Sequence, residues 1–540
     1  MENHAVDAFG SRRSTVYAPN GAVATSQPLA AQAGVRTLRD GGNAFDAAVA
    51  TAAALNVTEP TSTGLGGDAF MLYHSADGEV GAMRACGGAP SAATRERVRE
   101  AIADDRGLSR ESVSMPMRGP HTVTVPGTAR GWEATVEEFG RLSLADVLEP
   151  AIEYATEGYP VTEVVADAWT QAETLFETDH ARSAYLLGGD RAPAPGETVH
   201  LQRLGESLEA VAEEGADVVY EGYIADAIVE EVQRAGGLLT AEDLAGFEVE
   251  YPEPISVEYG DATVYELPPN NQGLIALEAL AVAEELDASS YAHGSAARMH
   301  YLVEAMKRAF HDGHRYITDP AFESVPPLSS RAWAKKRAAT VGETAAEVSF
   351  GVPDSNAEDA DTVLLCVGDD AGNVVSYINS RFAGFGSGLV AGETGIALQN
   401  RGASFSLERA HPNRLEPEKR PFHTLIPGVL ERGEADWSAF GVMGGYMQPQ
   451  GHLQTLVRLL DDGAALQRAL DAPRWRYRES GRLAVEARLD TTVKHGLLRR
   501  GHDLEVLSPG AFGGAQIVRN DDGTLSGATE PRKDGTVATF

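Results

Sequence analysis

The sequence predicts an α+β protein in which helices and buried strands share a large core. The chain has 540 residues, of which 43% are hydrophobic, so it can bury an extensive interior. Apolar residues at helical spacing dominate much of the first 360 residues, whereas strand-like apolar runs surround residues 362–378. Both kinds of element are therefore expected.

The expected elements can be taken in chain order. Residues 21–25 predict a short strand, and residues 28–40 predict a helix that ends at Gly41 and Gly42. Residues 44–57 are so rich in alanine that we expect a closely packed, buried helix. Residues 71–74 indicate a strand, residues 255–267 a pair of strands, residues 268–273 a turn, and residues 299–316 a helix.

The stretch that begins at Thr362 predicts a buried hairpin. A continuous apolar run follows this threonine, and the residues from Asp369 to Gly372 form a turn into a second run at 373–378. The preceding segment, residues 352–361, is short, acidic and free of bulky apolar side chains, which predicts an exposed linker open to cutting. A cut after Asp361 would make Thr362 an N-terminus.

The charge balance excludes several classes of partner. With 45 basic and 79 acidic residues the net charge is −34, so the surface repels nucleic acid and anionic lipid. Only six of the basic residues are lysines. An acidic excess with few lysines favours a halophilic protein, because high salt screens the self-repulsion, while an ordinary acidic cytosolic protein is the alternative.

The cysteines and the N-terminus favour a soluble cytoplasmic protein. Cys86 and Cys366 can form at most one disulfide and lie in no metal-binding spacing, which suits a reducing compartment. The paired arginines near the N-terminus precede no apolar segment. His311 and His314, three apart on an expected helix, could face a metal, but no acidic metal motif accompanies them, so we expect them in solvent or at the edge of the core, and no metal.

Two glycine patterns have a functional and a structural interpretation. Gly64, Gly66 and Ala69 match a dinucleotide-binding pattern by letter, but a helix precedes them and a strand follows, the reverse of the required order. We interpret them as a tight turn. Gly444 and Gly445 follow a predicted strand and can direct two backbone N–H groups to one point, as an oxyanion hole requires, although such pairs more often form plain turns.

Many segments of the chain, in matching order, resemble the γ-glutamyltransferase (glutathione hydrolase) family of N-terminal-nucleophile hydrolases. The resemblance implies an αββα sandwich of two stacked antiparallel sheets between helical layers, made as a proenzyme that cleaves itself. The matching segments are GGNAFDAAVATAAALNVTEPTSTGLGGDAF, VPGTARGW, ELPPNNQG, EAMKRAFHDGHRYITDP, DTVLLCVGDDAGNVVSYINSRFAGFGSGLVAGETGIALQNRG, EKRPFHTLIPGV, GGYMQPQGH, ALDAPRWRY and EPRKDG.

The resemblance also implies how the catalytic residues act. Cleavage before Thr362 would leave residues 1–361 and residues 362–540 as a large and a small subunit, interwoven in one αββα domain as a heterodimer. The Thr362 hydroxyl would be the nucleophile and its freed α-amine the general base, with a reference pKa of about 7.7–8.0. Ser380 would orient the nucleophile, and Gly444 and Gly445 would form the oxyanion hole. No cofactor is implied.

The substrate-binding positions depart from the family pattern. Cys86 stands where better-known members carry an arginine for the substrate carboxylate, and Arg84 is the nearest arginine. Ser404 replaces the carboxylate that binds the substrate amine. Arg401 replaces a neighbouring amide residue, and it could hold a carboxylate bidentately or form a structural ion pair.

The serine pair of the family is also replaced, by His423 and Thr424. We therefore expect an amide hydrolase or acyltransferase that acts on γ-glutamyl or related acyl amides through an acyl-enzyme. The alternative is an acylase or amidase for another carboxylate-bearing amide, of glutaryl or oxamate type. A non-catalytic protein that binds a small acid is a third reading, and a higher oligomer, such as a dimer of the heterodimers, stays open.

Overall fold

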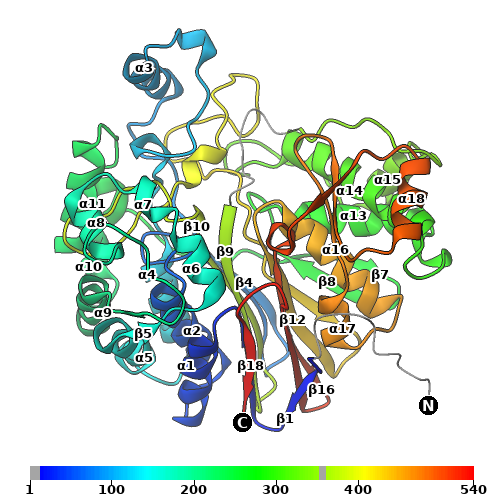
Figure 1. Cartoon of the computed structure of the whole chain (residues 1–540), viewed down its shortest axis with the longest axis horizontal. Helices are drawn as coiled ribbons and strands as arrows, with labels where there is room; N and C mark the ends of the chain where they lie inside the picture. Colours follow the sequence, from blue (N-terminus) through cyan, green and yellow to red (C-terminus); the bar gives the residue numbers. More distant parts are fainter. Residues whose placement is uncertain (1–12, 352–359) are drawn as a thin grey trace.

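Two stacked β-sheets form the centre of the protein, and a layer of helices covers each outer face (Figure 1). This computed structural model describes residues 13–351 and 360–540. The linker predicted at residues 352–361 lies largely outside these ranges. The αββα sandwich implied by the resemblance is confirmed.

One sheet, sheet B, has six strands and contains both strands of the predicted hairpin. Its strand order is β18-β2-β9-β10-β3-β4. The strands are β2 (Gly21–Thr25), β3 (Asp68–His74), β4 (Val80–Ala85), β9 (Ala360–Asp369), β10 (Val374–Ala383) and β18 (Thr536–Thr539). All of its neighbouring strands are antiparallel. The hairpin predicted from Thr362 onward is the β9–β10 pair.

The other sheet, sheet A, has seven strands and faces sheet B. Its order is β1-β17-β16-β12-β11-β8-β7, again antiparallel throughout. The strands are β1 (Val16–Ala18), β7 (Ile255–Tyr259), β8 (Ala262–Glu266), β11 (Gly428–Glu431), β12 (Asp436–Met443), β16 (Gly514–Asp521) and β17 (Thr524–Thr529). Two minor sheets lie outside the sandwich, β5 (Tyr159–Pro160) with β6 (Thr198–Val199), and β13 (Trp475–Tyr477), β14 (Leu483–Glu486) and β15 (Leu504–Leu507).

The helices divide between the two outer faces. Those that share a hydrophobic core with sheet B are α1 (Pro28–Arg39), α2 (Ala44–Thr58), α4 (Thr128–Phe139), α5 (Leu144–Glu157), α6 (Glu163–Trp169), α7 (Ala172–Leu175), α8 (Asp179–Tyr185), α9 (Gln202–Glu214), α10 (Asp217–Tyr220), α11 (Tyr223–Arg234) and α12 (Ala241–Ala245). Those on sheet A are α13 (Gly273–Glu285), α14 (Ala296–Tyr316), α15 (Arg331–Ala338), α16 (Met447–Leu460), α17 (Leu466–Asp471) and α18 (Thr491–Arg499). α3 (Arg95–Arg106) projects at the top of Figure 1 and packs in a separate small cluster.

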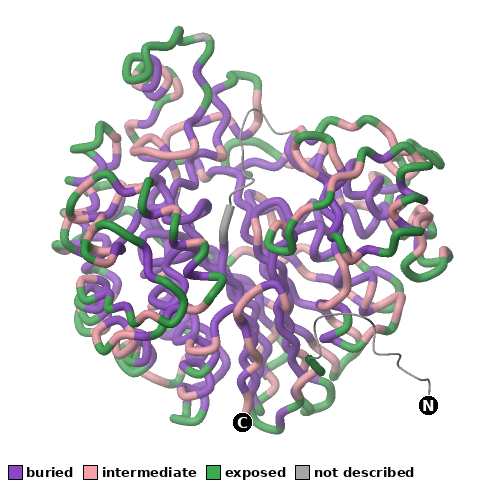
Figure 2. Tube along the Cα trace, viewed as in Figure 1, coloured by how far each residue is buried: buried purple, intermediate pink, exposed green. Residues whose placement is uncertain are grey.

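Side chains along β9 alternate between two cores. Val363, Leu365 and Val367 belong to the core shared with the helices, whereas Leu364 and Cys366 pack between the sheets. This alternation follows from the two-residue period of a strand. The strands in the middle of the molecule are accordingly buried in Figure 2. Thr362 shares the parity of Leu364, so its side chain faces sheet A.

The remaining expectations concern the membrane and the cysteines. No helix in residues 13–351 and 360–540 is long and apolar enough to cross a membrane. Cys86 and Cys366 are both buried free thiols.

Leu364→Ala should destabilise the sandwich by about 2–5 kcal/mol, because it leaves a cavity between the sheets where Leu364 contacts Gly441. Urea unfolding in the Thr362→Ala background, which keeps the chain in one piece, followed by circular dichroism would measure the loss. The matched control is Leu498→Ala, since Leu498 is 52% exposed and should change the free energy of unfolding by no more than about 0.5 kcal/mol. Equal effects of the two substitutions would contradict the assigned core.

Candidate active site

Thr362 lies near the start of β9 with its hydroxyl beside that of Ser380. The Oγ1 atom of Thr362 is 3.5 Å from the Oγ atom of Ser380, and both residues are buried. Ser380 lies on β10 and has the same parity as Ile378, which packs between the sheets. The two hydroxyls, which the sequence places eighteen residues apart, therefore meet on the inner face of sheet B.

A bulge in β10 lies opposite Thr362. The register between β9 and β10 shifts between Asn379 and Phe382, so Ser380 and the residue after it lie opposite Thr362 alone, and β10 has one residue more than β9 at this point. Phe382 has a φ of 81°, and its N–H donates to the Oγ atom of Ser380 at 2.8 Å. This hydrogen bond holds the Ser380 hydroxyl in place beside the hydroxyl of Thr362.

Gly444 and Gly445 lie at the same end of the sandwich, in the turn from β12 to α16. Leu364 contacts the position where Gly441 lacks a side chain, so the end of β12 lies across from the start of β9. Gly444 and Gly445 have φ angles of 112° and 55°. Among the described residues, none accepts a hydrogen bond from either N–H. The turn can thus offer two backbone donors to a ligand, as the oxyanion-hole prediction requires.

A buried charge pair, Asp68 and Arg401, lies next to these hydroxyls. Asp68 begins β3 and pairs with Ser380 across the sheet, and Arg401 lies in the short 3-10 helix η5 (Arg401–Ser404). Neither side chain is exposed, and the Nε atom of Arg401 is 3.9 Å from Oδ2 of Asp68. The guanidinium also lies over the ring of Phe382, 4.6 Å from its centroid. The pair therefore contacts the bulge that positions Ser380.

Burial shifts the pKa values of this pair towards their neutral forms. Desolvation raises the pKa of Asp68 to about 7, although Arg401 opposes the shift, and desolvation lowers the pKa of Arg401 to about 10. The nearby thiol of Cys86 has its pKa raised to about 12 by burial. At neutral pH, Arg401 is charged, Cys86 is a neutral thiol, and Asp68 is poised between its two forms.

His423 and Thr424 each hold one member of the charge pair. The Nδ1 atom of His423 accepts from the N–H of Leu425 at 3.2 Å, so its Nε2 carries the proton and donates to Asp68 at 2.9 Å. Burial, aided by Arg401, lowers the pKa of His423 well below its usual value, which keeps the ring neutral. Thr424 accepts from Nη1 of Arg401 at 2.8 Å.

Three amides of the turn before α13 clamp the segment that carries His423 and Thr424. Asn270 donates to the Pro421 carbonyl, and Asn271 donates to the Leu425 carbonyl. Gln272 donates through Nε2 to the carbonyl of Thr424 at 2.6 Å and to that of Gly445 at 3.0 Å. One side chain thus joins the polar cluster to the glycine turn.

Arg84 and Ser404 occupy different surroundings from Arg401. Arg84 donates through Nη2 to the carbonyls of Pro268 and Pro269 at 2.8 and 2.9 Å and forms an ion pair with Glu250. Arg84 thus binds the backbone of the turn before α13 and the carboxylate of Glu250. The Oγ atom of Ser404 is buried without a hydrogen-bond partner among the described residues.

Asp68 is the central residue that the sequence interpretation missed. The interpretation of its neighbouring glycines as a tight turn is confirmed, because a Cβ atom at Gly66 would lie 2.4 Å from the Ala397 carbonyl oxygen. The signal for Asp68 was a single carboxylate between that turn and the apolar strand that follows. Gln399, which donates to Oδ1 of Asp68 at 2.9 Å, carried no comparable signal.

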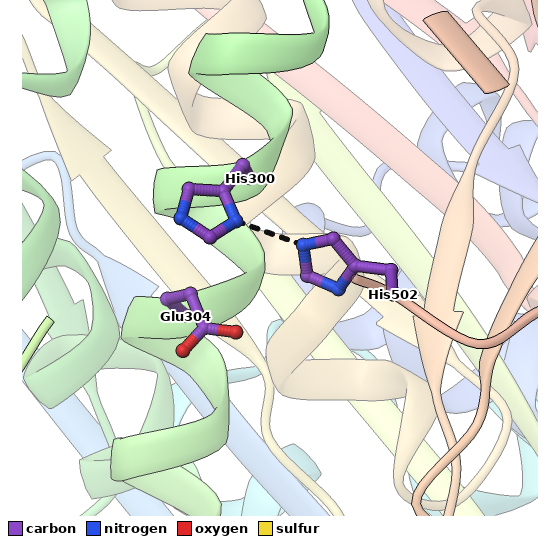
Figure 3. Close-up of side chains that lie close together, drawn as sticks. All are labelled: His300, Glu304 and His502. Carbon is purple, nitrogen blue, oxygen red and sulfur yellow. Dashed lines mark hydrogen bonds between the residues drawn. The ribbon is translucent and has the colours of Figure 1, made fainter. Parts of the chain in front are cut away.

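A cluster of potential metal ligands joins α14 to the segment that follows α18, in the helical layer on sheet A (Figure 3). His300, Glu304 and His502 place one ligand atom each within 4.8 Å of one another, and Nδ1 of His300 is 2.8 Å from Nε2 of His502. However, Lys307 and Arg308 each form an ion pair with one oxygen of Glu304. These cations would repel a metal ion, so the cluster is better suited to a structural role.

The histidines singled out from the sequence also contact the backbone. The Nδ1 atoms of His311 and His314 lie 3.1 and 2.8 Å from the carbonyl oxygens of Ser349 and Phe350. Both rings therefore hold residues 349–350 against α14, where His314 is buried and His311 is partly exposed.

Comparison with known proteins places this geometry in a family. Residues 30–540 match the family Gamma-glutamyltranspeptidase. The chain is 38% identical over 520 residues to the glutathione hydrolase-like YwrD proenzyme of Bacillus subtilis (strain 168), covering 94% of this chain and 96% of that protein. It is 35% identical over 531 residues to the oxamate amidohydrolase proenzyme of Klebsiella pneumoniae subsp. pneumoniae, covering 95% and 97%.

The likeness extends to solved structures. The crystal structure of cephalosporin acylase from Bacillus halodurans superimposes with a TM-score of 0.90 and 42% identity, covering all of this chain and 99% of that one. The chain therefore belongs to the gamma-glutamyltranspeptidase family, and it is an enzyme of the N-terminal-nucleophile hydrolase class.

Proposed function

We propose that the protein is a proenzyme that cuts itself between Asp361 and Thr362 and then hydrolyses amides through Thr362. The observation that carries this proposal is the hydroxyl pair of Thr362 and Ser380, 3.5 Å apart on the inner face of sheet B. The relatives in Bacillus subtilis and Klebsiella pneumoniae are both proenzymes by name, which supports the cut.

The cleavage step needs only groups of the chain and one water molecule. The Thr362 hydroxyl oxygen attacks the carbonyl carbon of Asp361, and the peptide C–N bond breaks as the nitrogen takes up a proton. The resulting ester joins Asp361 to the Thr362 oxygen. Water then hydrolyses this ester, which releases the carboxylate of Asp361 and leaves Thr362 with a free amine and a free hydroxyl.

Catalysis then repeats the same attack on a substrate amide. The free amine accepts the proton of the Thr362 hydroxyl, because its reference pKa of about 7.7–8.0 leaves a usable neutral fraction near pH 7. The N–H groups of Gly444 and Gly445 stabilise the oxyanion as the C–N bond breaks. Water, or an acceptor amine, finally removes the acyl group from Thr362.

The strand order supports two subunits that stay together. Sheet B contains β2, β3 and β4 from residues 1–361 and β10 and β18 from residues 362–540. Because β9 lies between β2 and β10, the new N-terminus would remain inside a sheet built from both pieces. Separation would break the ladder between β2 and β9.

Two acyl classes remain candidates for this mechanism. The family supports γ-glutamyl amides, whereas Ser404 and Arg401, at positions where the better-known members carry other residues, favour an acylase or amidase for a different carboxylate-bearing amide. The relatives include an oxamate amidohydrolase and a cephalosporin acylase by name. A protein that only binds a small acid is disfavoured, because binding alone does not require a nucleophile, an orienting hydroxyl and an oxyanion hole, the roles of Thr362, Ser380 and the two glycines.

Purified wild-type protein should run on a denaturing gel as two bands of about two-thirds and one-third of the 57.2 kDa chain. Thr362→Ala should run as one band, because alanine has no hydroxyl to attack Asp361. N-terminal sequencing of the smaller band should begin at Thr362. Active wild-type protein that stays uncleaved would refute the mechanism.

Ser380→Ala should slow both self-cleavage and amide hydrolysis by about 10- to 100-fold, since the Thr362 hydroxyl loses its neighbour and its orientation. Time courses of band appearance and kcat would measure the two effects. The matched control is Ser376→Ala on the same strand, because Ser376 donates to the Phe440 carbonyl at 2.8 Å instead. Equal losses in both variants would show that Ser380 acts only through the fold.

A further inference from the structure

Arg401 is a buried cation with an unfilled edge. Its Nη1 donates to Thr424, but Nε and Nη2 have no hydrogen-bond partner among the described residues. These two atoms form the side of a guanidinium that can grip a carboxylate with two parallel hydrogen bonds. A buried guanidinium with two empty donors is costly, so the edge is suited to an anionic ligand.

Asp68 balances the charge of Arg401 without filling that edge. The distance of 3.9 Å from Oδ2 to Nε exceeds a hydrogen bond. Its two oxygens instead accept from Gln399 and His423, at 2.9 Å each. Within this pair, the group with unmet hydrogen bonds is therefore the donor, and the matching ligand is an acceptor.

The position of the edge connects it to the acyl part of a substrate. Arg401 lies over Phe382, whose N–H donates to Ser380, and Ser380 is beside Thr362. Two groups, Phe382 and Ser380, thus connect Arg401 to Thr362, so we place the second carboxylate of an acyl group bonded to Thr362 at Arg401. The hydroxyl of Ser404, in the same short helix, has no hydrogen-bond partner among the described residues and is a further group that could bind such an oxygen.

We propose that Arg401 selects substrates whose acyl group ends in a carboxylate and carries no α-ammonium group, such as the monoamides of short dicarboxylic acids. Asp68 is the internal counter-ion of Arg401, and the carboxylate of such a substrate takes its place beside the guanidinium. This inference rests on the proposed function, because it places the acyl carbon at Thr362. It assigns Arg401 a direct contact with substrate and Asp68 a specificity role.

Binding of a substrate carboxylate at Arg401 should be coupled to proton uptake by Asp68. A substrate carboxylate at Arg401 leaves Asp68 beside a second negative charge, and Asp68 then binds a proton. Below pH 7 Asp68 is already largely protonated, so binding changes little with pH, whereas above pH 7 the affinity falls by up to about tenfold per pH unit. The other titratable groups that interact with Asp68 are His423, which donates to it, and Cys86 and Tyr220, whose pKa values the charge of Asp68 helps to raise.

The test compares three anilides on the cleaved enzyme: glutaryl, its neutral analogue pentanoyl, and γ-glutamyl. Wild type should prefer the glutaryl over the pentanoyl anilide by about 100-fold or more in kcat/KM, from two charge-assisted hydrogen bonds. Arg401→Gln should reduce this ratio to below about tenfold, because only the glutaryl anilide loses the two hydrogen bonds to the guanidinium. Arg401→Lys should recover part of the ratio.

Asp68→Asn should remove the rise of KM for the glutaryl anilide between pH 7 and 8.5 and leave the preference for a carboxylate intact. The matched control is Arg298→Gln, since Arg298 is also a buried arginine but pairs with Asp461 and Asp462 in the helical layer on sheet A. This variant should lose stability without changing the glutaryl-to-pentanoyl ratio.

Two results would overturn the proposal. One is an equal loss on both anilides in Arg401→Gln that Asp68→Asn restores, which would make the pair purely structural. The other is a preference for the γ-glutamyl anilide that disappears in Asp68→Asn, which would mean that Asp68 binds the α-ammonium group. If no anilide is cleaved, the proposed function fails instead, and calorimetry of glutarate with wild type and Arg401→Gln still decides whether Arg401 binds the carboxylate.

Discussion

The alternation of side chains along β9 determines where the chemistry of this protein can take place. Leu364 and Cys366 face the other sheet, because Val363 and Leu365 of the same strand face the helices and side chains alternate along a strand. Thr362 is therefore held on the inner face, across from the turn that ends β12. A shift of one residue in register would direct this hydroxyl into the helical layer.

A second constraint is the burial of a charge pair whose two side chains differ in how fully they are hydrogen-bonded. Asp68 and Arg401 are both buried, yet only the carboxylate has its hydrogen bonds filled. Their positions depend on a chain of neutral groups, from the clamping amides through His423 and Thr424. Gln272 also contacts Gly445, so the placement of the charge pair and the placement of the glycine turn depend on one side chain.

Local patterns were sufficient to predict most elements. The runs around residues 21–25, 28–40, 44–57 and 362–378 have one-sided or continuous apolar spacing, and each forms the expected strand or helix. The resemblance supplied the layer order, which no local pattern encodes. Asp68 could not be placed, because its partners Gln399 and His423 lie 331 and 355 residues away. Only the closed sandwich brings these three side chains together.

The interleaving of strands in sheet B has a consequence for the lifetime of the folded protein. In the intact chain, β2 and β9 find each other as parts of one molecule, at the high effective concentration that a tether provides. The proposed cleavage at Asp361–Thr362 would remove the tether while the ladder between them persists. Once unfolded, the two subunits of the mature protein would then reassemble much less readily than the intact chain folds. The durability of the mature protein would be set by how slowly it unfolds, because loss of the fold would be irreversible.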